Sequence, residues 1–146
     1  MVTLRPFTPD DWLVLAQYQY PGMTESDAKK LISEFNTGTF QGHRCETLAV
    51  DNGSCIVGFV SLLAQEDVSA SEGVEIYPPY RRRGYACEAV TALLKRAEVL
   101  GYQAVTAQIR QDNAASLALH KKLGFVVTAD FINKRGNPVY SLEYSI

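Results

Sequence analysis

The sequence predicts a single mixed α/β (α+β) domain, and three observations indicate this class. Its 146 residues are the usual size of one domain. Alternating, β-branched segments joined by short turns come first, which is typical of an antiparallel meander. A strand, an amphipathic helix and another strand follow, which is the pattern of a crossover unit. We therefore expect one domain over residues 1–146, with a mostly antiparallel sheet of about six to seven strands flanked by about four helices.

The N-terminal half supplies the meander and two helices. Residues 2–7 alternate as a strand does, and Thr8 followed by Pro9 predicts the start of a helix. Thr24, with an acidic residue three positions later, predicts the start of a second helix. Asp51-Asn52-Gly53-Ser54 is a strong hairpin turn. The other expected strands of this half are 46–50, 55–64 and 73–77.

The C-terminal half alternates helices and strands. After an arginine run, apolar residues recur at helical spacing and Gly101 fits a C-terminal cap, so one long helix is expected. Its apolar face comprises Ala86, Ala89, Val90, Leu93, Leu94 and Ala97. Asn113 predicts the cap of a short helix that ends at Leu123. The expected strands are 104–110, 125–131 and 139–144.

Composition and charge exclude several classes of protein. The chain has 14 Lys and Arg against 16 Asp and Glu, so no overall positive field favours nucleic acid as a partner. The first residues lack the apolar core of a signal peptide, and no apolar run approaches the roughly 20 residues of a membrane span. We therefore expect a cytoplasmic protein that binds neither nucleic acid nor a membrane.

The three cysteines indicate neither a disulfide framework nor a metal site. Cys45, Cys55 and Cys87 are odd in number and include no C-x-x-C pair. Cys87 lies in the first turn of the expected long helix, where the helix dipole favours a reactive thiolate. The alternative for Cys87 is a small packing residue.

The stretch Tyr80-Arg81-Arg82-Arg83-Gly84-Tyr85-Ala86 places three arginines where the long helix is expected to begin. A helix N-terminus carries partial positive charge and unpaired N–H groups, so anions are favoured there and cations are not. A bound phosphate or pyrophosphate would satisfy the amides, the dipole and the guanidinium groups together. The run therefore predicts an anion-binding site, with a basic patch for nucleic acid as the alternative.

Two motifs narrow the identity of the anion. The loop matches neither the G-K-[ST] phosphate loop nor the G-x-G-x-x-G dinucleotide loop. Read as [RQ]-x-x-G-x-[GA], residues 81–86 resemble the coenzyme-binding loop of the GNAT superfamily of acetyl-CoA dependent N-acetyltransferases. Residues 113–125 resemble that family's N-x-x-[AS]-x-x-[LF]-[YH]-x-K-x-G-F helix. The order of the expected elements is also similar to the family's fold along the whole chain.

The resemblance implies acetyl-CoA as cosubstrate, no metal, and a set of contacts. The first motif position, Arg81, would help to hold the phosphates, whereas the other two arginines would reach the 3′-phosphate or solvent. In this family the strand before the loop separates from its neighbour, so the main chain of Val74 and Ile76 would pair with the pantetheine arm. Asn113 and Ser116 would contact the coenzyme. The pyrophosphate would lie on the backbone amides of Arg81, Arg82, Arg83, Gly84, Tyr85 and Ala86.

The resemblance also implies candidates for the chemistry. A carboxylate before the loop often deprotonates the amine, and Glu72, Glu75 or a water chain are the candidates. Their spacing puts the two carboxylates on opposite faces of a strand, and we favour Glu75 for the cleft. His120 stands where the family commonly has a tyrosine that protonates the leaving thiolate, a role that histidine can share, with packing as the alternative. Gln108 stands where ribosomal-protein acetyltransferases have a glutamate, and an amide is no base. Backbone N–H groups near Ile76 would form an oxyanion hole.

The expected reaction is direct acetyl transfer, in a ternary complex, to a primary amine of a small molecule or a protein N-terminus. The alternative is a non-catalytic CoA-binding sensor or regulatory module of the same fold. A homodimer is also expected. An aromatic and acidic rim on the N-terminal helices would suit a cationic amine, and ordinary core packing is the alternative for its aromatics. The rim candidates are Trp12, Tyr18, Tyr20, Phe35, Phe40, Glu25, Asp27 and Glu34.

Overall fold

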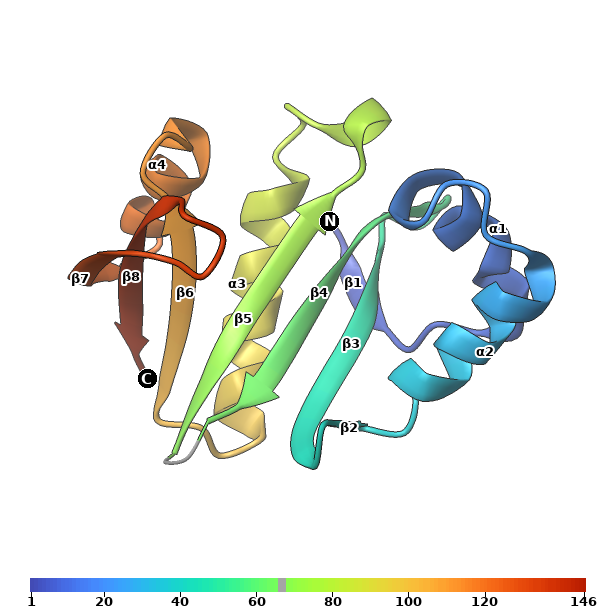
Figure 1. Ribbon diagram of the computed structural model, residues 1–146, viewed down its shortest axis with the longest axis horizontal. Helices are drawn as coiled ribbons and strands as arrows, with labels where there is room; N and C mark the ends of the chain where they lie inside the picture. Colours follow the sequence, from blue (N-terminus) through green and yellow to red (C-terminus); the bar gives the residue numbers. More distant parts are fainter. Residues whose placement is uncertain (66–67) are drawn as a thin grey trace.

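A computed structural model, which describes residues 1–65 and 68–146, confirms the mixed α/β fold. The sheet follows the order β1-β3-β4-β5-β6-β8-β7, and β2 pairs with β3 beside this path (Figure 1). Neighbouring strands are antiparallel except for the parallel pair β5–β6. The strands are β1 (Thr3–Arg5), β2 (Thr39–Phe40), β3 (His43–Asp51), β4 (Ile56–Ala64), β5 (Ser69–Ile76), β6 (Ala104–Arg110), β7 (Val126–Ile132) and β8 (Pro138–Ser145).

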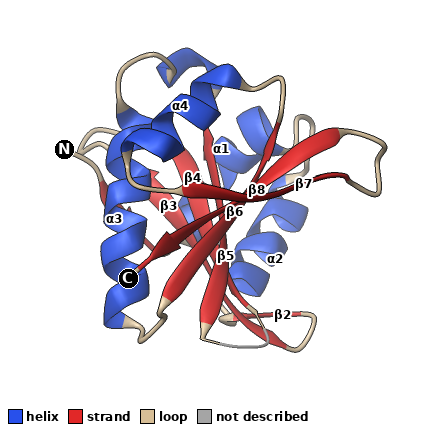
Figure 2. Ribbon diagram, turned by 90° about the vertical axis from the view of Figure 1, so that its left-hand side faces the viewer, coloured by secondary structure: helices blue, strands red, loops and turns tan. Residues whose placement is uncertain are grey.

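Helices cover both faces of the sheet. The long helix α3 packs on one face, and α1 and α2 lie on the other (Figure 2). Among the described residues, no helix is long and apolar enough to cross a membrane. The helices are α1 (Trp12–Val14), α2 (Glu25–Phe35), α3 (Tyr85–Val99) and α4 (Ala114–Lys122).

The two faces have separate apolar cores. On the α3 face, Val60 and Leu62 of β4 pack with Val90 and Leu93 of α3. On the α1/α2 face the core comprises Phe7, Leu15, Ala28, Ile32, Ala49, Ile56 and Tyr77. Because successive side chains of a strand alternate, β4 contributes to both cores. The sheet therefore separates two layers that can hold different ligands.

The first helix differs from the expected one. Thr8 and Pro9 do start it, but its turns are a 3-10 turn (Pro9–Asp11), α1 and a π turn (Leu15–Gln19). The backbone N–H of Tyr20 donates to the Leu15 carbonyl oxygen at 2.7 Å, which closes the wide last turn. Turns of π type occur frequently at functional sites.

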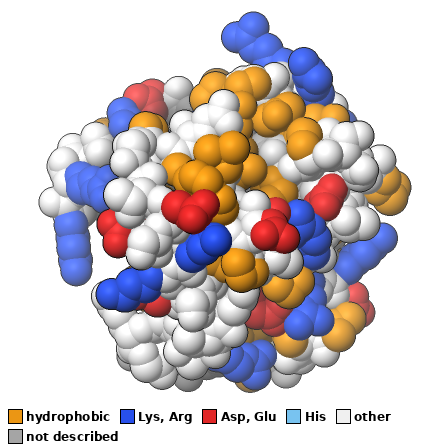
Figure 3. Space-filling model, turned by 90° about the vertical axis from the view of Figure 1, so that its right-hand side faces the viewer, with side chains coloured by type: hydrophobic (Ala, Val, Ile, Leu, Met, Phe, Trp, Pro, Cys, Tyr) orange, Lys and Arg blue, Asp and Glu red, His pale blue; other side chains and the backbone are white. Residues whose placement is uncertain are grey.

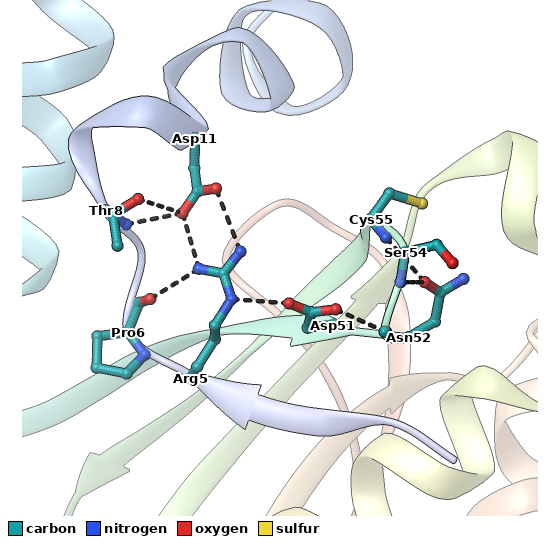
Figure 4. A network of polar contacts seen from close by, with 9 residues as sticks. Arg5, Pro6, Thr8, Asp11, Asp51, Asn52, Ser54 and Cys55 are labelled. Atoms are coloured by element: carbon teal, nitrogen blue, oxygen red, sulfur yellow. Dashed lines mark hydrogen bonds and ion pairs between the residues drawn. The ribbon is translucent and has the colours of Figure 1, made fainter.

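An arginine fixes this N-terminal segment to the sheet. Arg5 of β1 donates from Nε to Asp51 and from Nη1 to Asp11, each at 2.9 Å (Figure 4). Burial alone would raise the pKa of Asp11, but hydrogen bonds from Arg5 and Thr8 lower it below its usual value. The network joins β1, the first turn and the end of β3.

Strand boundaries depart from the sequence expectation at several places. β3 begins at His43 and β5 at Ser69, earlier than the expected 46 and 73, and β1 is shorter than 2–7. The two-residue strand β2 was not expected. The segment Ser69-Ala70-Ser71-Glu72 has little intrinsic strand propensity, and pairing with β4 supplies its backbone partners instead.

Candidate active site

The parallel pair β5–β6 is joined at one end and open at the other. Ser69–Ser71 of β5 face Ala104–Thr106 of β6. Beyond these residues β5 continues to Ile76 and β6 to Arg110, and the described parts of the two strands form no further pairing with each other. Figure 1 shows the strands diverging toward the start of α3. The expected separation of the two strands is confirmed.

The open edge of β5 presents backbone groups to the gap. The N–H of Tyr77 donates to the Val57 carbonyl oxygen of the β4 side at 2.8 Å. Because backbone directions alternate along a strand, the N–H groups of Val74 and Ile76 point away from β4 and into the gap. The Ile76 carbonyl accepts a hydrogen bond from Arg81 Nε at 2.7 Å. A ligand strand could therefore bond to β5 as a missing neighbour would.

Two adjoining cavities occupy the opening, and we call them together the β5–β6 cleft. The first, of about 430 Å³, lies between the end of β5, the start of α3 and α4. The second, of about 290 Å³, lies between β5 and β6. Val74, Asn113, Ser116 and His120 line both. The cleft therefore brings together residues of both sequence motifs.

The loop before α3 has the geometry of an anion site. Gly84, immediately before α3, has a left-handed backbone with φ of 82°, and so has Arg82 with φ of 64°. Among the described helices, α2 is capped by the Thr24 hydroxyl and α4 by the Asn113 amide oxygen, but no side chain caps α3. The amides at the start of α3 are thus available to a ligand.

The three arginines differ in position. Arg81 lines the cleft, as does Ala86 of α3. Arg82 and Arg83 are exposed and line neither cavity of the cleft. The Tyr85 hydroxyl accepts from the Asn52 amide at 3.2 Å, so its side chain turns toward the β3–β4 turn. Within residues 81–85 of this loop, only the backbone and the Arg81 side chain are placed to contact a ligand in the cleft.

Glu72 and Glu75 face opposite sides of β5, as their spacing predicts. The Glu72 side chain is 2% exposed and is paired through its carboxylate with His120 Nε2. The Glu75 side chain is 46% exposed, lies 3.8 Å from Arg81 and lines the cleft. Glu75 is therefore open to water, whereas Glu72 also lines the second cavity of the cleft but is buried against His120.

His120 is held at both ring nitrogens. Its Nδ1 lies 2.8 Å from the Ser116 carbonyl oxygen, which can only accept, so Nδ1 carries a proton. Its Nε2 faces Glu72, and the ring lies edge-on to Phe125 at 4.9 Å. Burial alone lowers the pKa of an imidazole, but the hydrogen bond and charge of Glu72 outweigh it, so the pKa of His120 lies above its usual value. Glu72 therefore favours the charged form of the His120 imidazole.

The helix motif positions its polar residues as predicted. Asn113 Oδ1 accepts from the Ser116 N–H at 3.1 Å and thereby caps α4. This bond uses the carbonyl end of the amide and leaves its NH₂ group for a ligand. Ser116 lines both cavities but also lies 3.4 Å from His120 Nδ1 through its hydroxyl.

Some cleft residues were missed in the sequence, and some candidates lie elsewhere. Gly73 and Arg110 line the second cavity together with Gln108, and Leu119 lines the first. The helical spacing of Leu119 from Ser116 is a signal that could have identified it. Cys87 lines neither cavity. Among the described residues, no group of three or more His, Cys, Asp or Glu is placed to hold a metal ion.

The expected aromatic and acidic rim divides into three groups. Trp12 and Tyr18 pack into the core of the α1/α2 face, so core packing accounts for them. Four other members line one cavity of about 380 Å³ between α2 and the sheet, which we call the α2 pocket. These four are Tyr20, Glu34, Phe35 and Phe40. Glu25 and Asp27 lie in the first turn of α2 and do not line it.

Comparisons with known proteins agree with this geometry. The chain matches the acetyltransferase (GNAT) domain family over residues 1–126. It is 28% identical over 108 residues to L-amino acid N-acyltransferase MnaT of Escherichia coli (strain K12), covering 70% of this chain and 62% of that protein. The chain thus aligns with about three fifths of the length of this relative.

Solved structures share the fold. RimL, a ribosomal L7/L12 alpha-N-protein acetyltransferase in complex with coenzyme A, superposes with a TM-score of 0.83 at 17% identity, covering 99% of this chain and 94% of that one. The yncA protein from Salmonella typhimurium, a putative acetyltransferase with its cofactor acetyl-CoA, gives a TM-score of 0.74 at 17% identity, with the same coverage of 99% and 94%.

Proposed function

Because this chain belongs to the GNAT acetyltransferase family, we propose that it is an N-acetyltransferase that transfers an acetyl group from acetyl-CoA to a primary amine. The observation that carries this proposal is the β5–β6 cleft, where an uncapped helix start and an unpaired strand edge open onto one cavity. The names of MnaT and RimL denote an amino acid and a protein N-terminus as acceptors. Both acceptors present a primary amine, which supports that class here.

The residues of the cleft fit acetyl-CoA. No side chain caps the start of α3, and the Arg81 guanidinium lines the cavity beside it, so the backbone amides from Arg81 to Ala86 suit a pyrophosphate. The outward N–H group of Val74 suits an amide of a pantetheine arm, which leaves the outward N–H group of Ile76 for the acetyl group. The free NH₂ of Asn113 is a further donor at the same cavity. When bound, acetyl-CoA supplies an acetyl group activated as a thioester.

We assign proton transfers to two residues that line the first cavity of the cleft, Glu75 and His120. Glu75, exposed at the cleft, takes the proton that the amine nitrogen loses as its new bond to the acetyl carbon forms. The N–H of Ile76 stabilises the negative charge on the carbonyl oxygen. As the C–S bond breaks, the thiolate receives a proton from His120. The products are an amide and a free thiol, and no covalent acetyl-enzyme forms.

Glu72 has a different role from Glu75 in this proposal. It is buried against His120 and therefore acts as a positioning residue that keeps the imidazole charged and oriented. A proton given up by His120 is replaced through the water-accessible cavity that Ser116 and Asn113 also line. The departure from the family's tyrosine at this position is thus accompanied by a carboxylate partner.

One observation favours a second candidate function. Both ring nitrogens of His120 are bonded within the protein, and Gln108 has no basic group, so the cleft could bind CoA without turnover. Such a sensor would bind acetyl-CoA and acetylate no amine. A cytoplasmic location and a homodimer remain predictions for either function.

An amine panel followed by release of free thiol tests the proposal. We expect turnover that depends on both acetyl-CoA and amine, and a fall of about 10²- to 10⁴-fold in kcat/KM for Glu75→Gln. Glu25→Gln, on the exposed first turn of α2, is the matched control and should keep its activity. Acetyl-CoA binding without turnover on any amine would support the sensor instead.

A further inference from the structure

The α2 pocket lies on the face of the sheet opposite α3 and has a chemical character of its own. Apolar and aromatic side chains dominate its lining, and Glu34 is the one charged residue among them. Lysine and arginine are absent from this lining, which consists entirely of described residues. The lining residues that define its chemistry are Tyr20, Leu31, Phe35, Phe40, Phe59 and Leu63.

The pocket adjoins the β5–β6 cleft across one strand pair. Gly73 of β5 lines the cleft, and Ser61, its direct partner on β4, lines the α2 pocket. A Cβ atom on Gly73 would lie 2.8 Å from Ser61 Oγ, so the absence of a side chain keeps this position clear. One step along the pair, Phe59 of the pocket faces Glu75 of the cleft. A molecule with its amine at Glu75 can therefore extend over Gly73 toward the pocket.

Two rim residues of the pocket are unusually exposed for aromatics. Phe40 is 53% exposed and Tyr20 46% exposed. Hydrophobic side chains also gather between scattered charges on the face that α1 and α2 present (Figure 3). Exposed apolar side chains around a cavity are typical of a ligand site. An apolar ligand group in the pocket would cover them.

The π turn is an independent observation at the same place. It supplies Gln19 to the lining, and Tyr20 follows it directly. Gln19 is held in place because its Oε1 accepts from the hydroxyl of the buried Tyr77 at 3.0 Å. Turns of π type occur frequently at functional sites, and this one contributes Gln19 to the lining of a cavity.

We propose that the α2 pocket binds the substituent of the acceptor amine, and that this substituent is an aryl or branched alkyl group that carries no carboxylate. This proposal rests on the proposed acetyltransferase function and narrows its substrate class. The apolar lining favours the substituent by burial. A carboxylate on that substituent would meet Glu34 without a cationic partner in the lining, which disfavours acidic substituents such as a benzoate.

Three probe amines separate the effect of the aryl group from the effect of a carboxylate. 2-Phenylethylamine has the aryl group, ethylamine lacks it, and 4-(2-aminoethyl)benzoic acid adds a carboxylate to the same ring. We expect kcat/KM for 2-phenylethylamine to exceed that for each of the others by about tenfold or more. Equal values, or a preference for ethylamine or for 4-(2-aminoethyl)benzoic acid, would overturn the proposal while leaving acetyl transfer itself established.

A pocket-filling variant tests the location. Thr47→Phe places a large ring in the α2 pocket from β3, and Thr128→Phe makes the same change on the exposed strand β7 as a control. We expect Thr47→Phe to lower kcat/KM for 2-phenylethylamine by about 10- to 100-fold and to change that for ethylamine by less than about twofold. An equal loss for both amines would place the substituent elsewhere.

Two further measurements keep the outcome decisive. If Thr47→Phe melts well below the Thr128→Phe control, Phe40→Ala at the exposed rim replaces it, and a selective loss of several-fold for 2-phenylethylamine is expected. If acetyl-CoA binds but no amine is acetylated, the proposed function fails. Calorimetric titration with 2-phenylethylamine then tests the pocket separately. Binding to the unaltered protein that is lost in Phe40→Ala would support the α2 pocket as the site of the aryl group. Absence of binding to the unaltered protein would refute it.

Discussion

β5 has two neighbours, and the two junctions are built in opposite ways. Its junction with β4 is closed from Ala70 to Ile76, and Gly58 approaches so closely that a Cβ there would lie 2.0 Å from the Glu75 carbonyl oxygen. Its junction with β6 is closed over three residue pairs and then opens. The site therefore arises where β5 is not paired with β6, while its pairing with β4 keeps the strand in place.

The Glu72–His120 pair lies where the second junction changes character. Ser71 is the last residue of β5 that faces β6, and Glu72 follows it directly. From this point a buried ion pair to α4 replaces strand pairing as the link across the gap. The pair therefore holds the closed end of the cleft in shape.

Removing Glu72 should give the largest effect on stability. We expect Glu72→Ala to lower the free energy of unfolding by about 3–5 kcal/mol, because it leaves His120 buried without its partner. Glu75→Ala, at an exposed position on the same strand, is the matched control and should cost less than about 1 kcal/mol. Urea unfolding measures both, and equal losses would contradict the assigned role of the pair.

A methyl group added at Gly58 tests the closed junction between β4 and β5. Gly58→Ala should lower the free energy of unfolding by about 2–4 kcal/mol, because the new atom overlaps the β5 backbone. Gly84→Ala, at the open end, meets no atom within 4 Å and should lose only about 1–2 kcal/mol from its left-handed backbone. Thermal unfolding compares the two, and a larger loss at Gly84 would reverse the comparison.

The ion pair also predicts a pH dependence. The pKa of folded His120 is raised, so its contribution is fully present below the unfolded value of about 6.5 and is lost as pH rises through the folded value. Unfolding free energies measured from pH 6 to pH 9 should fall for this reason. In Glu72→Gln the charge that raises the pKa of His120 is absent, so the free energy of unfolding should fall less over this pH range. An unchanged fall would mean that other titrating groups cause it.

The smallest effect concerns the strained loop. Arg82 has a left-handed backbone that glycine adopts without strain, so Arg82→Gly should raise the free energy of unfolding by about 0.5–1 kcal/mol. Arg83 has no such backbone, and Arg83→Gly should be neutral or destabilising. Thermal unfolding measures both variants. A lower free energy of unfolding in Arg82→Gly would mean that the Arg82 side chain stabilises the loop.

Local rules predicted much of this site from sequence. Thr24 and Asn113 were identified as caps because their side-chain bonds span only three residues. The opposite faces of Glu72 and Glu75 followed from strand alternation. The contact between Glu72 and His120 joins residues 48 positions apart, and no local sequence pattern predicts it. The α2 pocket likewise depends on how α2 sits over β3 and β4.

Hydrogen exchange at β5 tests most directly the claim that acetyl-CoA occupies the open edge. On addition of acetyl-CoA at about 100 times its Kd, the amides of Val74 and Ile76 should exchange about 100-fold more slowly, because the ligand must leave before they open. The amide of Glu75, which faces β4, serves as the internal reference. Unchanged exchange at Val74 and Ile76 with the ligand bound would contradict the account.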